Sequence, residues 1–513
     1  MKFKRAGGVL LHPTSLPGQD GIGDLGPEAY RWVDFLAETG CGLWQILPLG
    51  PTGYGDSPYQ CFSAFAGNPY LISSTVLLDD DLLAIEDLRD RPSFPADRVD
   101  YGAVIPWKIA LLDRAYTRFN RLRMTSLKKE FEDFKERNSS WLEDFSLFMA
   151  IKETRGGVSW EEWPAPLRRR EAPALDSFRR ENGQLIERHA FRQFLFFRQW
   201  SSLREYAHHH NVLIIGDVPI FVAYDSADVW SHPDLFFLDE QGKPTVVAGV
   251  PPDYFSPTGQ LWGNPLYRWD RHAEQEYSWW IARLRSTLSQ VDMMRLDHFR
   301  GFAAYWEVPA GSLTAEKGRW VTGPGADFFH KIEASLGDLP IIAEDLGVIT
   351  PDVVALRETF NLPGMKVLQF AFSTDPDDPF LPHNFTTNCV AYTGTHDNDT
   401  TVGWYTSSAT DEERDLCRRY LARSGDDIAW DMIRAVWSSV AVMAVTPMQD
   451  LLSLGSEARM NYPSRASGNW TWRLLPGALT EGLSNRLKEM NYLYSRQAGR
   501  PEKKLRRSMH GAA

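Results

Sequence analysis

Three apolar runs in the sequence are each followed by a carboxylate side chain. The runs span residues 291–296, 341–343 and 390–394, and the carboxylates belong to Asp297, Glu344 and Asp397. Short, continuous apolar runs are typical of parallel strands buried on both faces, whose carboxyl ends meet at one edge of a sheet. Carboxyl groups gathered at such an edge suit chemistry on a glycosidic bond, which needs one protonated and one ionised group.

The residues around these carboxylates suggest different tasks for them. Arg295 stands two residues before Asp297 and therefore points to the same side of the strand, where its cation is expected to hold Asp297 ionised for nucleophilic attack. Glu344 follows an apolar strand and is the better candidate for a raised pKa and an acid/base role. Asp397 is expected to hold sugar hydroxyls and to support positive charge at the anomeric carbon. Structural alternatives remain open: an ion pair of Arg295 with Asp297, a helix cap at Asp345 and a turn at Asp397-Asn398.

Eight apolar strands, most of them separated by amphipathic helical stretches, recur along the chain. Eight βα repeats close naturally into a (β/α)8 TIM barrel, whose active site lies at the carboxyl ends of the strands. We therefore predict an α/β fold in which residues 1–513 form a single catalytic barrel, with little chain left after the last strand for another domain. The predicted strands span residues 8–12, 43–48, 212–216, 291–296, 341–343, 366–370, 390–394 and 441–445.

Two connections between the predicted strands are far longer than an ordinary crossover. We predict a mainly helical insertion at about residues 50–205, after the second strand, and another insertion at residues 224–270, after the third. The second insertion contains an aromatic loop, residues 249–267, rich in proline and glycine. Such a loop often covers a site, although a packed connection between subdomains has a similar composition.

Composition and charge exclude several classes of partner. The net charge is −12 and basic residues form only local clusters, so nucleic acid and anionic membranes are not expected partners. The first strand begins by residue 8, which leaves no room for a targeting peptide, and no apolar run is long enough to span a membrane. We expect a cytoplasmic protein. The 19 Trp residues belong mostly to a large core, and a minority could form stacking platforms for sugar rings.

The remaining motifs do not indicate a cofactor. The segment Gly21–Gly26 matches GxGxxG, but it does not lie directly on a strand-to-helix turn, as a dinucleotide site requires. The consecutive residues His208–His210 would point in different directions on a helix, and the four cysteines lack zinc spacing. We therefore expect no metal and no organic cofactor, and we expect buried free thiols at Cys41 and Cys389.

Several segments together resemble the signature sequences of the amylomaltases. These enzymes are 4-α-glucanotransferases, or disproportionating enzymes, of glycoside hydrolase family 77, and they are relatives of the α-amylases. The resemblance covers nearly the whole chain, although Leu296 stands where isoleucine is often expected and the C-terminal β-sandwich of the α-amylases is absent. The matching segments span residues 11–17, 57–60, 216–220, 249–267, 295–301, 343–347 and 395–398.

The resemblance implies a role for each candidate site residue. Asp297 would be the nucleophile, Glu344 the general acid/base and Asp397 the transition-state stabiliser. The residues expected to bind the donor sugar or to line the glucan groove are Arg295, His396, Asp217, Tyr59, Tyr254 and Phe255. Further candidate glucan contacts are Gln260, Trp262, Asn264, His298 and Asn469.

The implied function is retaining transfer of α-1,4-glucan segments to the 4-hydroxyl of an acceptor glucan or glucose, through a covalent glucosyl-aspartate. The expected partners are maltooligosaccharides, amylose, glycogen or starch, and the loop at residues 249–264 is the candidate for limiting the access of water. Other interpretations are hydrolysis by the same site, a non-catalytic glucan-binding barrel and a nucleotide-dependent oxidoreductase. A non-catalytic barrel would be expected to have lost its carboxylates, and all three are present.

Overall fold

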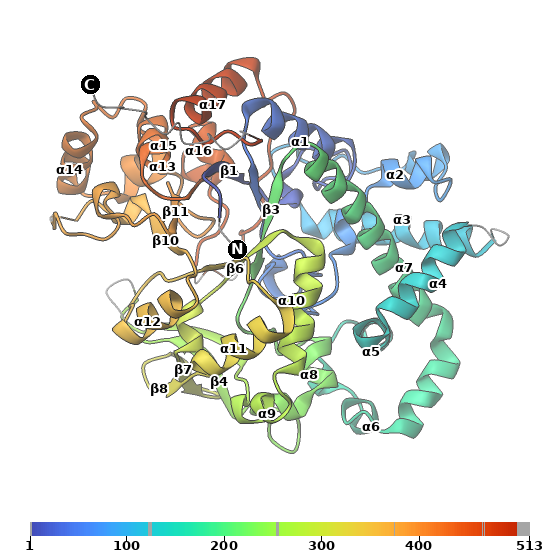
Figure 1. The fold of residues 1–513 in the computed structure, drawn as a ribbon. Coiled ribbons are helices and arrows are strands. Elements are labelled where there is room, and N and C mark those ends of the chain that lie inside the picture. The colour runs from blue at the N-terminus through green and yellow to red at the C-terminus, as the bar shows by residue number, and fades with distance from the viewer. Residues whose placement is uncertain are drawn as a thin grey trace, which may run out of the picture.

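Eight parallel strands lie at the centre of the computed structural model, which describes residues 3–121, 126–252, 256–373, 375–463, 465 and 467–499 (Figure 1). The strands are β1 (Ala6–Leu10), β2 (Leu43–Gln45), β3 (Leu213–Val218), β6 (Met293–Leu296), β9 (Ile341–Ala343), β10 (Gly364–Val367), β11 (Cys389–Tyr392) and β12 (Met443–Pro447). Hydrogen bonds join them in the order β10-β11-β12-β1-β2-β3-β6-β9. The barrel closes where the Ala343 N–H donates to the carbonyl of Pro363, next to β10, at 2.9 Å. The predicted (β/α)8 TIM barrel is therefore confirmed.

The barrel strands are buried on both faces, which explains why they read as continuous apolar runs in the sequence. One buried cluster draws side chains from all eight strands and fills the interior: Leu10, Leu43, Ile215, Met293, Ile342, Met365, Val367, Val390, Tyr392, Met443 and Val445. Side chains on the other face meet the surrounding helices. Trp44 of β2, for example, contacts Trp32 and Trp200, with ring centroids 6.4 and 6.2 Å away.

The predicted limits match the structure at β9 and differ by one to three residues at the other seven strands, of which β10 and β12 are examples. β10 covers residues 364–367, whereas residues 368–370, predicted as part of the strand, form a short 3-10 helix. β12 covers residues 443–447 in place of 441–445. At β10 the apolar run continues past the strand end, and at β12 it begins before the strand, so hydrophobicity alone does not mark where the hydrogen-bonded ladder starts and stops.

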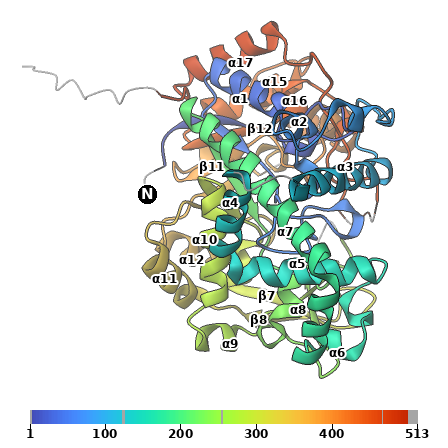
Figure 2. The same cartoon turned by 90° about the vertical axis from the view of Figure 1, so that its right-hand side faces the viewer.

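Helices cover the outside of the barrel, and the last helix lies beside the first (Figures 1 and 2). The longer ones are α1 (Pro27–Thr39), α7 (Ala172–His209), α10 (Ser278–Gln290), α11 (Gly325–Leu336), α12 (Pro351–Thr359), α14 (Asp411–Leu421), α15 (Ile428–Ser438) and α17 (Glu481–Leu493). Shorter ones are α9 (Trp269–Glu274), α13 (Thr401–Gly403) and α16 (Met448–Leu451). Among the described residues, none of the helices combines the length and the apolar character needed to cross a membrane.

The segment between β2 and β3 is largely helical. It contains α2 (Ser74–Asp79), α3 (Tyr101–Arg121), α4 (Ser126–Arg137), α5 (Ser139–Thr154), α6 (Ala165–Arg168) and the long α7. α3 to α6 lie to one side of the barrel in Figure 1. α7 connects them to it, because Trp200 in its C-terminal half contacts Trp44 of β2.

A second sheet lies beside the barrel and is antiparallel. Its strands, in the order β5-β4-β7-β8, are β5 (Gln260–Pro265), β4 (Val246–Val250), β7 (Ala304–Pro309) and β8 (Arg319–Thr322), and the short α8 (Ala227–Ser231) precedes them. β4 and β5 follow barrel strand β3, whereas β7 and β8 follow β6. The sequence analysis did not predict these strands, because glycine or proline occurs in β4, β5 and β7, β8 has only four residues, and none of them shows a clear alternation of apolar and polar residues.

Candidate active site

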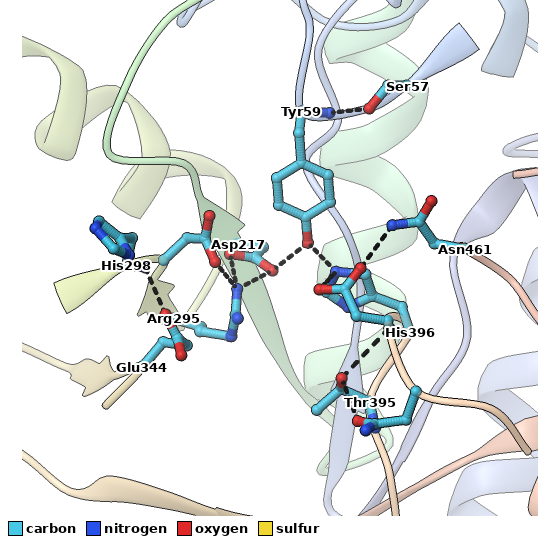
Figure 3. Close-up of polar contacts among 12 residues, drawn as sticks. Ser57, Tyr59, Asp217, Arg295, His298, Glu344, Thr395, His396 and Asn461 are labelled. Carbon is cyan, nitrogen blue, oxygen red and sulfur yellow. Dashed lines mark hydrogen bonds and ion pairs between the residues drawn. The ribbon is translucent and has the colours of Figure 1, made fainter. Parts of the chain in front are cut away.

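The three carboxylates follow the carboxyl ends of barrel strands β6, β9 and β11. The strand register places Asp297 and Glu344 at one level: Asp217 of β3 lies opposite Arg295 of β6, and Leu296 of β6 lies opposite Ala343 of β9. Asp297 and Glu344 are the next residues along their strands. Figure 3 shows the resulting cluster, in which side chains from β3, β6, β9 and the segment after β11 approach one another.

Arg295 supplies the central positive charge of this cluster. Its Nη1 lies 2.9 and 2.8 Å from the two carboxylate oxygens of Asp217 and 2.8 Å from Oδ1 of Asp297. Burial opposes the charge of Arg295, but Asp217 and Asp297 outweigh it and raise the pKa of the guanidinium. Arg295 therefore stays charged and is placed to balance the negative charge of Asp297, whose side chain is 28% exposed and accessible to a ligand.

Glu344 has very different surroundings. Its residue is 9% exposed, and its Oε2 and Oε1 accept hydrogen bonds from the backbone N–H groups of His298 (2.7 Å) and Leu346 (2.9 Å). Burial, with a further contribution from Asp297, raises the pKa of Glu344 to about 8, against an opposing effect of Arg295. Glu344 is therefore a protonated acid at neutral pH, placed beside the Arg295–Asp297 pair.

The contact between His298 and Glu344 depends on an unusual backbone conformation. His298 has φ = 50° and ψ = 50°, in the left-handed region that residues other than glycine seldom adopt. This conformation lets the chain turn sharply after Asp297 while the His298 N–H donates to Glu344. Strained backbone of this kind is concentrated at functional sites, where the surrounding structure maintains it.

Asp397 is held by two neighbours. Its Oδ1 accepts a hydrogen bond of 2.6 Å from Nδ2 of Asn461, and its Oδ2 lies 3.3 Å from Nε2 of His396. The surrounding protein disfavours the charge, but His396 and Asn461 outweigh this effect and lower the pKa of Asp397 well below its usual range. The lowered pKa means that this carboxylate is ionised. Its side chain is 46% exposed and therefore accessible to a ligand.

Tyr59 connects the two sides of the cluster, as Figure 3 shows. Its hydroxyl donates to Oδ2 of Asp217 at 2.7 Å and lies 2.8 Å from Nε2 of His396. The Tyr59 and His396 rings are also stacked, with centroids 5.2 Å apart. The loop after β2 is thereby joined to both β3 and the segment after β11.

The candidates on β5 differ in their closeness to the cluster. The ring of Trp262 stands edge-on to the His298 ring, with centroids 4.8 Å apart, and its Nε1 donates to Oε1 of Gln260 at 3.2 Å. Asn264 is buried, and its Nδ2 donates to the carbonyl of Val222 at 2.9 Å. Trp262 and Gln260 therefore border the site, whereas the amide of Asn264 holds β5 in place.

Two further candidates, Tyr254 and Phe255, lie outside the described residues. Asn469 is described, and its side chain is used within its own loop. Its Oδ1 accepts from the Tyr462 N–H at 2.9 Å, and its Nδ2 donates to the carbonyl of Arg465, also at 2.9 Å. Asn469 thus shapes the loop that carries Asn461.

Asn461 is the site residue that sequence reasoning missed. The segment Asn461-Tyr462-Pro463 has the composition of an ordinary turn and contains no carboxylate or strand pattern. Only the fold brings it to the segment after β11, where the Asn461 N–H also donates to the carbonyl of His396 at 3.1 Å.

The described residues contain no group of three or more His, Cys, Asp or Glu side chains arranged to hold a metal ion. In the histidine run, His208 lies at the end of α7 with its Nε2 2.8 Å from Oδ1 of Asp292. The cysteines are free thiols, and Cys41 and Cys389 are buried, as expected.

Comparison with known proteins identifies the family. Residues 11–479 match the model of glycoside hydrolase family 77, which is described as 4-alpha-glucanotransferase. A 4-alpha-glucanotransferase from Thermus thermophilus is 54% identical over 498 residues, which cover 96% of this chain and 99% of the relative. One from a Synechocystis strain is 49% identical over 500 residues, which cover 97% of this chain and 99% of the relative.

A solved structure shows the same relationship. An amylomaltase from Streptococcus agalactiae, in complex with acarbose, superposes with a TM-score of 0.94 at 42% sequence identity, covering 96% of this chain and 100% of the other. Fold and sequence therefore agree over almost the whole length of the relatives. The chain belongs to glycoside hydrolase family 77, the 4-alpha-glucanotransferases.

Proposed function

We propose that the protein transfers α-1,4-glucan segments by a double displacement, with Asp297 as nucleophile, Glu344 as general acid and base, and Asp397 as transition-state stabiliser. The observation that carries this proposal is the contrast between two neighbouring carboxyl groups. Glu344 is buried and has a pKa of about 8, whereas Asp297 lies 2.8 Å from Arg295 and is partly exposed. Environments that differ in this way assign the acid and the nucleophile.

In the first half of the reaction, protonated Glu344 gives its proton to the oxygen of the glycosidic bond that breaks. The carboxylate of Asp297 attacks the anomeric carbon from the opposite face, so one C–O bond forms as the other breaks and a β-linked glucosyl-aspartate results. The negative charge of Asp397 stabilises the positive charge that develops on the sugar in the transition state.

In the second half, Glu344 acts as a base and takes the proton of the incoming 4-hydroxyl. The acceptor oxygen attacks the anomeric carbon, the bond to Asp297 breaks, and the α-linkage is restored. Two inversions give overall retention, and the number of glycosidic bonds does not change.

The donor sugar is expected to bind beside the cluster formed by Tyr59, Asp217, Arg295 and His396. These groups are already held by one another at hydrogen-bonding distances, so little reorganisation is needed when the sugar binds. The Streptococcus relative binds acarbose, which supports an oligosaccharide ligand for the same site here.

Transfer also requires that the sugar acceptor compete with water, which is present at roughly 55 M, through binding and positioning. We assign this task to the segment of residues 249–264. It includes Trp262, whose ring contacts the His298 ring next to Glu344. An aromatic wall there offers an apolar face for the acceptor sugar and limits the space for productive water.

The products formed from maltotriose test the reaction type. Transfer gives glucose together with longer chains, and the number of reducing ends stays constant. Hydrolysis raises the number of reducing ends steadily, because water replaces the sugar acceptor. A steady rise at a rate similar to that of glucose release would refute the proposed transferase mechanism.

A trapping experiment tests the covalent intermediate. The Glu344→Gln variant should react with α-maltotriosyl fluoride, because fluoride leaves without protonation, and the glycosyl group should then stay on the enzyme for lack of a base. Mass spectrometry should place one maltotriosyl unit on the peptide that contains Asp297. The double variant Asp297→Asn/Glu344→Gln is the matched control and should carry no adduct, and an adduct on any other residue would exclude Asp297 as the nucleophile.

A further inference from the structure

A small cavity borders His396. It has a volume of about 30 Å³ and is bordered by the ends of β1 and β12 and by the segment after β11, with His12, Ser15 and His396 in its wall. One ordered water needs roughly 10–15 Å³ and two to four polar partners. The cavity therefore has space for a water molecule and polar groups to bind it.

The hydrogen bonds of Tyr59 determine which nitrogen of His396 carries a proton. The single proton of the Tyr59 hydroxyl is donated to Asp217 at 2.7 Å. The same hydroxyl lies 2.8 Å from Nε2 of His396, so it must accept a hydrogen bond there, and Nε2 carries a proton. In a neutral imidazole, Nδ1 is then an acceptor.

Nδ1 of His396 is the unpaired atom of this arrangement. The residue is 5% exposed, and its Nδ1 is buried without a hydrogen-bond partner among the described residues. Leaving a buried acceptor unpaired is unfavourable, so most such groups bind either protein or an ordered water.

His12, on the wall of the same cavity, has the complementary arrangement. Its Nδ1 accepts a hydrogen bond from the Leu47 N–H at 3.3 Å. Burial lowers the pKa of His12 to about 3, so the ring is neutral at ordinary pH. A neutral imidazole that accepts at Nδ1 carries its proton on Nε2. His12 therefore has a donor to offer, and His396 has an acceptor.

We propose that one water molecule binds in this cavity, accepts a hydrogen bond from Nε2–H of His12 and donates one to Nδ1 of His396, so that His12 is a positioning residue for the active site. The Ser15 hydroxyl, which contacts Sδ of Met460 at 3.9 Å, provides a third partner for the water. The result is a one-directional chain of hydrogen bonds from His12 through the water, His396 and Tyr59 to Asp217.

The direction of this chain has a consequence for the site. With a proton on Nε2, His396 donates to Tyr59, and the Tyr59 hydroxyl is free to donate to Asp217, the partner of Arg295. If His396 instead carried its proton on Nδ1, Tyr59 would have to donate to His396, and Asp217 would lose a hydrogen bond. The Asp397 carboxylate, 3.3 Å from Nε2, favours the same tautomer, and the water and His12 stabilise it from the Nδ1 side, which keeps the donor-sugar cluster in one arrangement.

Two substitutions of His12 separate this role from simple structural support. In His12→Asn the side-chain oxygen occupies the position of Nδ1 and retains the acceptor for Leu47, but the donor at Nε2 is lost. In His12→Gln the side-chain amide reaches the position of Nε2 and retains the donor, but the acceptor is displaced.

If the water relay operates, His12→Gln should keep kcat/KM for maltotriose within about threefold of the wild type, and His12→Asn should lose roughly 10- to 100-fold. A purely structural role through Leu47 predicts the opposite order, and that order would overturn the proposal.

The kinetic comparison rests on the proposed function, so a second measurement is independent of it. ¹⁵N NMR of the histidine rings, with His396 assigned from the signal that a His396→Gln variant lacks, should show a protonated Nε2 and an unprotonated Nδ1 in the wild type. A high-resolution crystal structure should show a water in contact with both His12 and His396. A proton on Nδ1 or a cavity without water would refute the relay even if transfer activity is confirmed.

Discussion

Replacing Glu344 with Gln should stabilise the folded protein more strongly as the pH rises. The pKa of Glu344 is raised from 4.5 to about 8, mainly by burial. Between these two values the folded state keeps the proton that the unfolded chain releases. Raising the pH over this window therefore favours unfolding of the wild type, and the variant, which has no carboxyl group at this position, escapes this effect.

The size of the effect follows from the shift in pKa. Each unit corresponds to about 1.4 kcal/mol, so the raised pKa of Glu344 lowers the free energy of unfolding of the wild type by about 1 kcal/mol at pH 5, about 3 kcal/mol at pH 7 and about 5 kcal/mol at pH 9. The two carboxyl oxygens of Glu344 accept hydrogen bonds from the backbone N–H groups of His298 and Leu346. In the Gln variant an NH2 group replaces one of these oxygens and faces one of the two N–H groups. This mismatch costs roughly 1–3 kcal/mol but does not depend on pH, so the pH dependence isolates the ionisation.

Equilibrium urea unfolding at pH 5, 7 and 9, followed by tryptophan fluorescence, measures the difference. The free energy of unfolding of the variant minus that of the wild type should rise by about 4 kcal/mol between pH 5 and pH 9. Glu333→Gln is the matched control, because Glu333 is exposed on α11 and its exchange removes no buried charge. A difference that stays constant across this range would refute the assignment of Glu344 as a buried acid.

The same pKa predicts that kcat/KM for transfer falls as the pH rises through about 8, because Glu344 then lacks the proton for the leaving group. A pH profile in which kcat/KM already falls below pH 6 would contradict this prediction. Asn461→Ala should lower kcat/KM roughly 10-fold or more by removing the 2.6 Å hydrogen bond to Asp397, and Asn461→Asp should be at least as harmful because it adds a like charge. An unchanged kcat/KM would show that Asn461 does not position Asp397. Arg300→Ala should lower the free energy of unfolding by roughly 1–3 kcal/mol, since Arg300 binds the carbonyl of Val348 and lies 3.9 Å from the centre of the Trp320 ring. Trp320→Leu should cost less in the same urea assay, because it keeps the hydrogen bond from Arg300 to Val348 and removes only the ring contacts of Trp320 with Arg300 and Trp306.

The barrel could be predicted because its strands are buried on both faces and therefore appear in the sequence as short apolar runs. Each of the three carboxylates follows such a run, so their location at strand ends was also open to prediction. The antiparallel sheet of β4, β5, β7 and β8 was not, because its strands come from two separate segments and lack an alternating pattern. Hydrophobic periodicity reveals strands that bury one or both faces. It gives little signal for strands of a partly exposed sheet that contain glycine and proline.

The contacts that tune the site were not predictable from the sequence for a different reason. Asn461 reaches Asp397 over 64 positions, and Tyr59 reaches His396 over 337 positions, so neither pairing leaves a local pattern. The contribution of His298 to Glu344 comes from its backbone N–H in a left-handed conformation, which no side-chain motif reveals. Sequence patterns located the candidate reacting groups, whereas their electrostatic environment depends on tertiary contacts.

The charges of Asp297 and Arg295 also explain how Glu344 can serve first as an acid and then as a base in the proposed reaction. Burial is the main cause of the high pKa of Glu344, Asp297 raises it further and Arg295 lowers it. In the proposed reaction the first step converts Asp297 into a neutral ester, so the negative charge that raised the pKa disappears. Arg295 remains, held by both carboxylate oxygens of Asp217, and its lowering effect is no longer opposed by Asp297. The pKa of Glu344 must therefore fall after the first step, when a base is needed, and recover once the transfer to the acceptor frees Asp297.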